Sequence, residues 1–296
     1  NCQLHEVEFN RMTKKIRISL LRGICQLPAY VAYSKGFLAE AGIQAEISIA
    51  PTAWMVPQNM ASGDIQFAVI PWTRVVSSCD AGIQLRVVCG SGIEEAAIVL
   101  QPGVEPEQVT KVAVPHEGGM KDLTAMSLVQ IMGWQDAELV RMPSGDGAIL
   151  AFLGEGGHAA SMIEPYATIL EERGLGRTIK RTGDVWPGAP GCSLSTTAKI
   201  VDEEPDLVGA MVAAYLRAAR FIEEHPEESS EIASKFIGVD AKYVFKALQN
   251  NHPDVSAIKN TSAMDKVLDL MIERKYLNGR PEGFAETKFL SLAESC

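Results

Sequence analysis

The stretch IRISLLRGICQLPAYVAYSKGFLAEAGIQAEISI, residues 16–49, sets the fold that we expect for the whole chain. Apolar and β-branched residues predict a strand over Ile16–Leu21, and alternating polar and apolar residues predict a second one over Glu46–Ile49. Between them, Ala29–Ala41 is predicted to be a helix because apolar residues share one face and Gly42 can end it. The order strand, helix, strand is typical of a parallel α/β unit.

The same alternation continues through the first two thirds of the chain. Further strands are predicted at Phe67–Ile70, Gln84–Cys89, Ala97–Gln101, Lys111–Val114, Glu138–Arg141, Ala159–Ile163, Arg177–Arg181 and Ser193–Thr197. Helices are predicted at Met55–Ser62, Thr73–Ala81, near Lys121–Met132, near Asp146–Leu153 and at Tyr166–Arg173. The last third is predicted to be helical at Pro205–Glu224, Glu227–Phe236, Lys242–Asn250 and Ala263–Arg274, the last helix capped by Ser262.

Proline and glycine after Gln101 indicate that the chain leaves one body for another, and the strand at Ser193–Thr197 is expected to return to the first. We therefore expect two α/β lobes, each a mixed, mostly parallel sheet flanked by helices, joined by two crossings. Residues 1–101 and 192–296 would form lobe 1, including the helical C-terminal section. Residues 102–191 would form lobe 2.

Charge and hydropathy exclude several classes of protein. The 296 residues include 27 basic and 37 acidic ones, a formal net charge of -10, so a nucleic-acid partner is not expected. A net charge of -7 lies between Asp202 and Glu231, where interleaved apolar residues predict the solvated faces of helices. The sequence has no apolar run long enough to span a membrane, and Asn1–Lys15 lacks the apolar core of a signal peptide. Whether the chain is a mature exported protein or a cytosolic one stays open at this point.

The six cysteines include no CxxC pair, so a metal site is not expected. Cys79 and Cys89 are close enough in sequence for a short-loop disulfide. Buried free thiols are favoured instead, because Cys89 ends an apolar run.

Ligands of open α/β sheets bind beyond the carboxyl ends of the strands, so the candidate site is sought in the residues that follow each strand. Three of the four tryptophans, Trp54, Trp72 and Trp186, lie there. They indicate stacking against a flat heterocyclic ligand, with packing between the lobes as an equal alternative. The segments that follow the strands are Arg22–Pro28, Pro51–Trp54, Pro71–Thr73, Gly90–Glu94, Pro115–Lys121, Met142–Asp146, Glu164–Tyr166 and Thr182–Trp186.

The segment Pro115–Lys121 is a second source of ligand contacts. A glycine-containing turn before a helix offers free N–H groups, and Lys121 adds a positive charge, which together suit an anion. The alternative is a tight turn with an exposed lysine. The candidate ligand-binding residues are Cys25, Gln26, Trp54, Pro71, Trp72, Thr73, Ser91, His116, Gly118, Gly119, Lys121, Glu164, Tyr166 and Trp186.

Signals for catalysis are weaker. The sequence has no GxSxG, HExxH or GxGxxG motif. His116 or Glu164 is the candidate for proton transfer if the chain is an enzyme. Glu164 could equally accept hydrogen bonds from ligand N–H groups or be a buried carboxylate that bridges the lobes.

Four blocks in order along the chain resemble the solute-binding proteins of ABC transporters for nitrate, sulfonates, taurine and thiamine-pyrimidine precursors. Ala61–Val69 carries Gln66 where the family usually has Asp. The resemblance implies a two-lobed periplasmic-binding-protein-like fold of type II. The four blocks are Pro28–Ile43, Ala61–Val69, Ile163–Ala167 and Glu224–Glu228.

The resemblance also implies how the protein works. The lobes would close over a small molecule about hinges near Gln101–Gly103 and Gly191–Ser193, and the partner would be an ABC permease in the membrane. We expect a monomer without a cofactor or catalytic activity, periplasmic or otherwise extracytoplasmic, with a membrane anchor left open. The expected ligand is a nitrogen heterocycle such as a thiamine-pyrimidine precursor.

Three alternatives stay open. A sulfonate- or nitrate-type oxyanion would bind through Lys121 and helix N-termini instead of stacked rings. A metabolic enzyme on the same fold is the second alternative, although a relative that makes the thiamine pyrimidine carries a cysteine-rich iron-binding run that is absent here. A ligand-sensing module of a larger receptor is the third.

Overall fold

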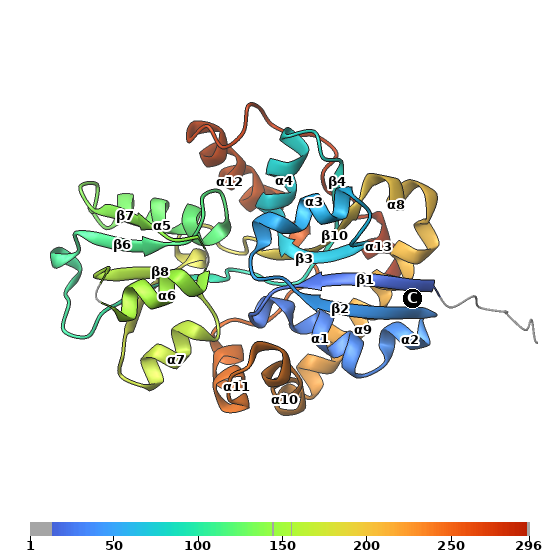
Figure 1. Cartoon of the computed structure of the whole chain (residues 1–296), viewed down its shortest axis with the longest axis horizontal. Helices are drawn as coiled ribbons and strands as arrows, with labels where there is room; N and C mark the ends of the chain where they lie inside the picture. Colours follow the sequence, from blue (N-terminus) through green and yellow to red (C-terminus); the bar gives the residue numbers. More distant parts are fainter. Residues whose placement is uncertain (1–13, 144, 155, 295–296) are drawn as a thin grey trace, which may run out of the picture.

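The computed structural model describes residues 14–143, 145–154 and 156–294. These residues form two α/β lobes that lie side by side, as Figure 1 shows. Each lobe contains one five-stranded sheet, in the orders β2-β1-β3-β10-β4 and β7-β6-β8-β5-β9. The predicted α/β fold of two mixed sheets with a helical C-terminal section is confirmed.

The first sheet is built around β1 (Lys14–Leu20), which runs parallel to both β2 (Ile43–Ile49) and β3 (Phe67–Pro71). β10 (Cys192–Thr197) lies antiparallel between β3 and β4 (Leu85–Gly90). The chain therefore returns to the first sheet at the strand where the return was predicted.

The second sheet is built around β6 (Lys111–Val114), which runs parallel to β7 (Glu138–Arg141) and β8 (Ala159–Ile163). β5 (Ala96–Leu100) is antiparallel to both β8 and β9 (Arg177–Arg181). Every residue of β5 is buried, because helices cover both faces of this sheet.

Thirteen α-helices and five short 3-10 helices complete the described part of the chain. Among the described residues, no helix combines the length and apolar character that a membrane span requires. The α-helices are α1 (Leu27–Ser34), α2 (Phe37–Glu40), α3 (Val56–Ala61), α4 (Trp72–Asp80), α5 (Met120–Ile131), α6 (Gly145–Leu153), α7 (Tyr166–Glu172), α8 (Ala198–Glu203), α9 (Pro205–Glu224), α10 (Pro226–Ile237), α11 (Ala241–Asn250), α12 (Thr261–Glu273) and α13 (Lys288–Glu294). The 3-10 helices are η1 (Ile24–Gln26), η2 (Ala53–Met55), η3 (Pro106–Gln108), η4 (Thr182–Asp184) and η5 (Ala257–Lys259).

Alternation along β5 explains how the second lobe is covered on both sides. Ile98 and Leu100 belong to the apolar cluster that contains Leu128 of α5. Val99 belongs to the cluster that contains Phe152 of α6. Successive side chains of a strand point to opposite faces, so α5 and α6 cover opposite faces of the sheet.

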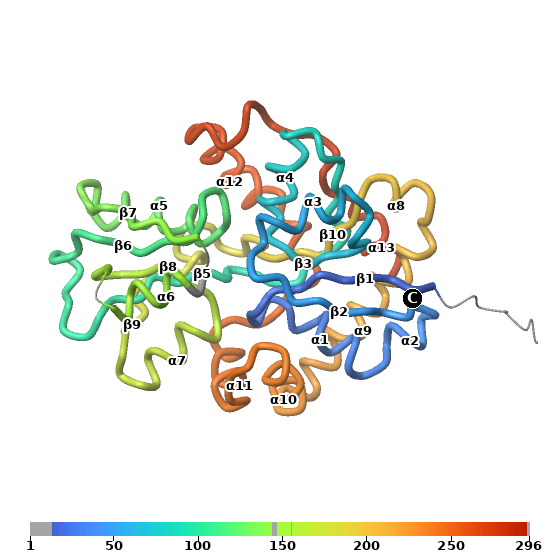
Figure 2. The backbone as a smooth tube through the Cα atoms, in the orientation of Figure 1, coloured from blue at the N-terminus to red at the C-terminus, as the bar shows by residue number. Residues whose placement is uncertain are grey.

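The first crossing between the lobes lies earlier than predicted. Residues 91–95 connect β4 of the first sheet to β5 of the second, so the sheets divide before Ala96 and not at residue 101, and the predicted hinge at Gln101–Gly103 lies beyond this connection. The reason is that β5 pairs with β8 and β9, which no local pattern reveals. The second crossing ends at β10, close to the predicted hinge at Gly191–Ser193, and Figure 2 follows the backbone through both crossings.

Two helix predictions are corrected at their ends. The helix expected over Ala29–Ala41 is interrupted by Gly36, whose φ of 77° ends α1 before α2 begins. The cap of α12 is Asn260 and not Ser262, because the Asn260 side chain accepts a hydrogen bond from the N–H of Ala263 at 3.1 Å. The acidic side chains between Asp202 and Glu231 are exposed or half-buried, and all but Glu204, which lies between α8 and α9, are on helices, as predicted.

Trp72, at the start of α4, is part of the core of lobe 1. Its side chain is fully buried and its indole Nε1 donates to the carbonyl of Pro190 at 2.8 Å. The ring also stacks on Phe284 with 6.0 Å between the ring centroids. Trp72 therefore fixes the end of the second crossing against lobe 1.

Replacing Trp72 by Ala should lower the free energy of unfolding by about 3–5 kcal/mol, because the truncation leaves a large cavity. The measurement is urea unfolding followed by circular dichroism. Trp72→Phe is the matched control, and should cost about 1–3 kcal/mol because it keeps a ring but leaves the Pro190 carbonyl without its partner. Equal stability of Trp72→Ala and the parent would contradict the core assignment.

Candidate functional site

A cavity of about 1020 Å³, part of it open to solvent, lies between the two lobes. Lobe 1 contributes residues directly after β1, after β2 and at the start of α4. Lobe 2 contributes the loop between β6 and α5, the start of α5 and the end of β8. The cavity thus lies at the carboxyl ends of parallel strands in both sheets, where open α/β sheets bind their ligands.

The structure brings half of the predicted site residues to this cavity. Seven of them line it: Cys25, Trp54, Pro71, His116, Gly119, Lys121 and Tyr166. The other seven do not line it: Gln26, Trp72, Thr73, Ser91, Gly118, Glu164 and Trp186.

Trp54 is the one tryptophan of the predicted three that lines the cavity. Its side chain is 47% exposed, and its ring stacks on that of His116 with 6.0 Å between the centroids. Trp72 and Trp186 are buried, at 0% and 5% exposure. Trp72 and Trp186 are buried among apolar side chains, so of the three indoles expected to stack on a ligand only Trp54 offers its ring to the cavity.

Glu164 is engaged within lobe 2. One of its carboxylate oxygens lies 2.8 Å from the guanidinium of Arg181, and the other accepts from the N–H of Thr168 at 3.0 Å. Its carbonyl accepts from the N–H of Ile24 at 3.1 Å, which connects lobe 2 to lobe 1 through the backbone. The structure therefore supports a buried carboxylate at Glu164. It places this carboxylate outside the cavity, where it cannot accept hydrogen bonds from a ligand there.

The turn before α5 is already bound to a carboxylate of the protein. Gly118 has a φ of 76°, and its N–H donates to Asp122 at 2.9 Å. Asp122 is buried, lies 2.6 Å from a guanidinium nitrogen of Arg141 and accepts from the hydroxyl of Tyr276 at 3.2 Å. Burial raises the pKa of Asp122 in spite of these partners. The N–H of Gly118 is thus not available to an external anion, although Gly119 and Lys121 still line the cavity.

Two arginines that the sequence analysis did not single out also line the cavity. Arg22 follows β1, inside a segment that was predicted to lie at the cavity, and Arg74 lies one residue beyond the predicted Thr73. The guanidinium of Arg74 donates to the carbonyl of Glu117 at 2.7 Å, which connects α4 of lobe 1 to the loop between β6 and α5 of lobe 2. Burial lowers the pKa of Arg74, while nearby Asp122 acts in the opposite direction.

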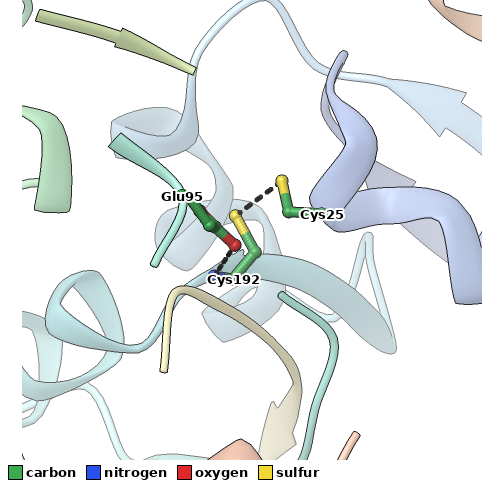
Figure 3. Close-up of side chains that lie close together, drawn as sticks. All are labelled: Cys25, Glu95 and Cys192. Carbon is green, nitrogen blue, oxygen red and sulfur yellow. Dashed lines mark hydrogen bonds between the residues drawn. The ribbon is translucent and has the colours of Figure 1, made fainter. Parts of the chain in front are cut away.

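Cys25, Glu95 and Cys192 form a buried cluster in the cavity lining, drawn in Figure 3. The two sulfurs lie 3.3 Å apart, and the backbone N–H of Cys192 donates to a carboxylate oxygen of Glu95. The amide of Gln26 donates to the sulfur of Cys25 at 3.3 Å. Burial raises the pKa of Glu95. The pKa of Cys192 is also raised, chiefly by burial and further by its neighbours Cys25 and Glu95.

One donor atom from each member of this cluster lies within 4.8 Å of the others, so the three could hold a metal ion. The sequence pointed to Cys25 but missed Glu95 and Cys192, because the three residues come from distant segments and no short spacing marks them. Cys79 and Cys89 are free thiols, as favoured from the sequence, but only Cys89 is buried as expected, whereas Cys79 is half-buried. Cys2 and Cys296 lie outside the described residues.

Solved structures with the same fold are numerous, and three illustrate the likeness. The ligand-binding component of an ABC-type import system from Staphylococcus aureus, solved with zinc bound, has a TM-score of 0.84 and 18% identity over 95% of this chain and 99% of that chain. The periplasmic nitrate-binding protein NrtA from Synechocystis PCC 6803 has a TM-score of 0.81 and 16% identity over 95% and 88%. The periplasmic aliphatic sulphonate-binding protein SsuA from Escherichia coli has a TM-score of 0.75 and 15% identity over 90% and 94%.

At these identities the likeness concerns the fold alone, which is the periplasmic-binding-protein-like fold that the sequence blocks implied. A comparison with curated protein sequences finds no match. The sequence model of the NMT1-like family matches residues 10–237, well over half of the chain. The chain therefore belongs to the NMT1-like family.

Proposed function

We propose that this protein is an extracytoplasmic solute-binding protein of an ABC importer and that it delivers a small molecule to a membrane permease. The observation that carries the proposal is the cavity lined by both lobes at their junction. Family membership supports it, and so does a fold shared with nitrate- and sulphonate-binding proteins. A monomer without nucleic-acid contacts is part of the same proposal.

Contacts across the cavity support binding by lobe closure. The ring of Trp54 in lobe 1 stacks on His116 in lobe 2, and Arg74 in lobe 1 donates to the Glu117 carbonyl in lobe 2. A ligand in the cavity beside these contacts would touch both lobes at once and favour the closed arrangement over an open one.

The preferred ligand is a nitrogen heterocycle that carries an acidic group, such as a pyrimidine phosphate from the thiamine-precursor class. Trp54 and Tyr166 offer aromatic surface to a flat ring. Arg22, Arg74 and Lys121 line the same cavity and provide positive charge for an anionic group.

The second candidate is a sulfonate- or nitrate-type oxyanion without a ring. The three cationic side chains favour it, because they outnumber Glu95, the single carboxylate that the described part of the chain contributes to the cavity lining. For the enzymatic alternative, His116 is the one remaining candidate for proton transfer. The carboxylate of Glu164 is bound by Arg181 and Thr168 outside the cavity.

A cognate ligand should stabilise the folded chain. At a concentration about 100 times its Kd it should raise the free energy of unfolding by about 2.7 kcal/mol. Thermal-shift screening of pyrimidines, their phosphates, sulfonates and nitrate tests this expectation. A screen in which none of these compounds stabilises the protein would count against the proposed ligand classes.

Two substitutions separate the candidate ligands. Trp54→Ala should weaken binding of a heterocycle about tenfold, through lost stacking and apolar contact, and leave nitrate affinity nearly unchanged. Arg74→Gln should weaken either anion by about 10- to 100-fold, because it removes charge-assisted hydrogen bonds. Isothermal titration calorimetry measures both effects.

Arg217→Gln is the matched control for Arg74→Gln, since Arg217 is exposed on α9 and does not line the cavity. Unchanged heterocycle affinity in Trp54→Ala would reject the stacking model. Unchanged affinity for every anion in Arg74→Gln would reject the assignment of positive charge to ligand binding.

A further inference from the structure

Cys25, Glu95 and Cys192 come together from three separate segments. Cys25 lies in η1 of lobe 1, Glu95 ends the first crossing, and Cys192 ends the second crossing as β10 begins. All three side chains are buried, and each lines the cavity. Figure 3 shows the sulfur of Cys192 between the sulfur of Cys25 and the carboxylate of Glu95.

The backbone around Glu95 is shaped to accept its carboxylate. A Cβ at Gly92 or at Gly191 would clash with the Glu95 carboxylate, and at Gly92 it would also approach Cys25 Cβ to 2.6 Å. Only glycine leaves enough space at these two positions. The two crossings therefore enclose the carboxylate and direct it toward the two sulfurs.

A bound cation would account for this burial. Placing a carboxylate in the protein interior is costly unless the group is paired, and buried charges are commonly paired or coordinate metals. Glu95 accepts a hydrogen bond from the backbone N–H of Cys192, lies against the thiols of Cys25 and Cys192, and interacts electrostatically with Lys121. Two thiols beside it supply further metal donors.

The sulfur separation also fits metal coordination better than a disulfide. Two thiolates at about 2.3 Å from a tetrahedral zinc ion lie about 3.8 Å apart. A disulfide requires about 2.05 Å between the sulfurs. The observed sulfur–sulfur distance of 3.3 Å is closer to the zinc value than to the disulfide value, so metal binding requires the smaller movement of the two sulfurs.

We propose that Cys25, Cys192 and Glu95 bind one divalent transition-metal ion of the zinc class. Thiolate ligands select against Mg²⁺ and Ca²⁺, which prefer oxygen donors. Three protein ligands leave a fourth tetrahedral position, and because each ligand lines the cavity, this position is open to a solute or water there.

Charge at the site is consistent with this ion. Two thiolates and a carboxylate around a dication leave a net charge of about -1 on simple counting. Lys121 lines the same cavity and supplies a compensating positive charge. The metal site does not depend on the identity of the transported solute, nor on whether the chain transports one.

The test uses the full chain, reduced, freed of metal and then titrated with Zn²⁺ and Co²⁺ alone. We expect one equivalent of Zn²⁺ per chain after dialysis, measured by mass spectrometry of the metal. Co²⁺ should give a thiolate-to-cobalt charge-transfer band and the strong visible bands of tetrahedral coordination. Cys25→Ser and Cys192→Ser should each weaken binding by more than about tenfold and reduce the charge-transfer band.

Glu95→Gln preserves the shape of the side chain, so it keeps the test valid if a cysteine variant fails to fold. It should weaken metal binding and retain the thiolate band. Cys79→Ser is the matched control, because Cys79 is a free thiol outside the cavity, and it should bind metal as the parent does. Reduced, folded protein that binds no stoichiometric metal would overturn the proposal, as would equal affinity in the parent and in Cys25→Ser, Cys192→Ser and Glu95→Gln.

Discussion

The two segments that connect the lobes are hydrogen-bonded to each other, and the position of the cavity depends on this pairing. The N–H groups of Ser91 and Gly92 both donate to the carbonyl of Cys192, at 3.1 and 2.9 Å, and the N–H of Gly191 donates to the carbonyl of Gly92 at 2.9 Å. Buried backbone groups must find such partners, so the crossings satisfy each other where neither belongs to the interior of a sheet. The carboxyl ends of strands from both sheets consequently meet around one space.

Buried charge is distributed unevenly around that space. The carboxylates of Asp122 and Glu164 are each matched by an arginine of the same lobe, Arg141 and Arg181, which lowers the cost of burying them. Arg22, Arg74 and Lys121 instead line the cavity, where Glu95 is the single carboxylate among the described lining residues. The whole-chain charge of -10 therefore does not describe the cavity, whose lining is cationic on balance.

Strands and most helices could be predicted because apolar runs and helix-ending glycines are local signals. The partners of β5 could not be predicted, because whether Ala96–Leu100 joins the first or the second sheet depends on pairing with residues 59 or more positions away. The site shows the same limit. Position after a strand identified Trp54 and His116, but it does not fix side-chain direction, so Trp72 and Trp186 turned into the core. Glu95 and Cys192 gave no local signal at all.

The C-terminal section of lobe 1 also reaches lobe 2 on two sides, as α11 packs against α7 and α12 against α5 (Figure 1). Arg173 of lobe 2 lies over the ring of Tyr243, and the hydroxyl of Tyr276 reaches Asp122. A rotation that separates the lobes must break contacts on at least one of these sides. In the proposed solute-binding role, the energy barrier to opening would therefore be set in part by helices that do not line the cavity, and substitutions far from the cavity would change how fast a bound molecule leaves.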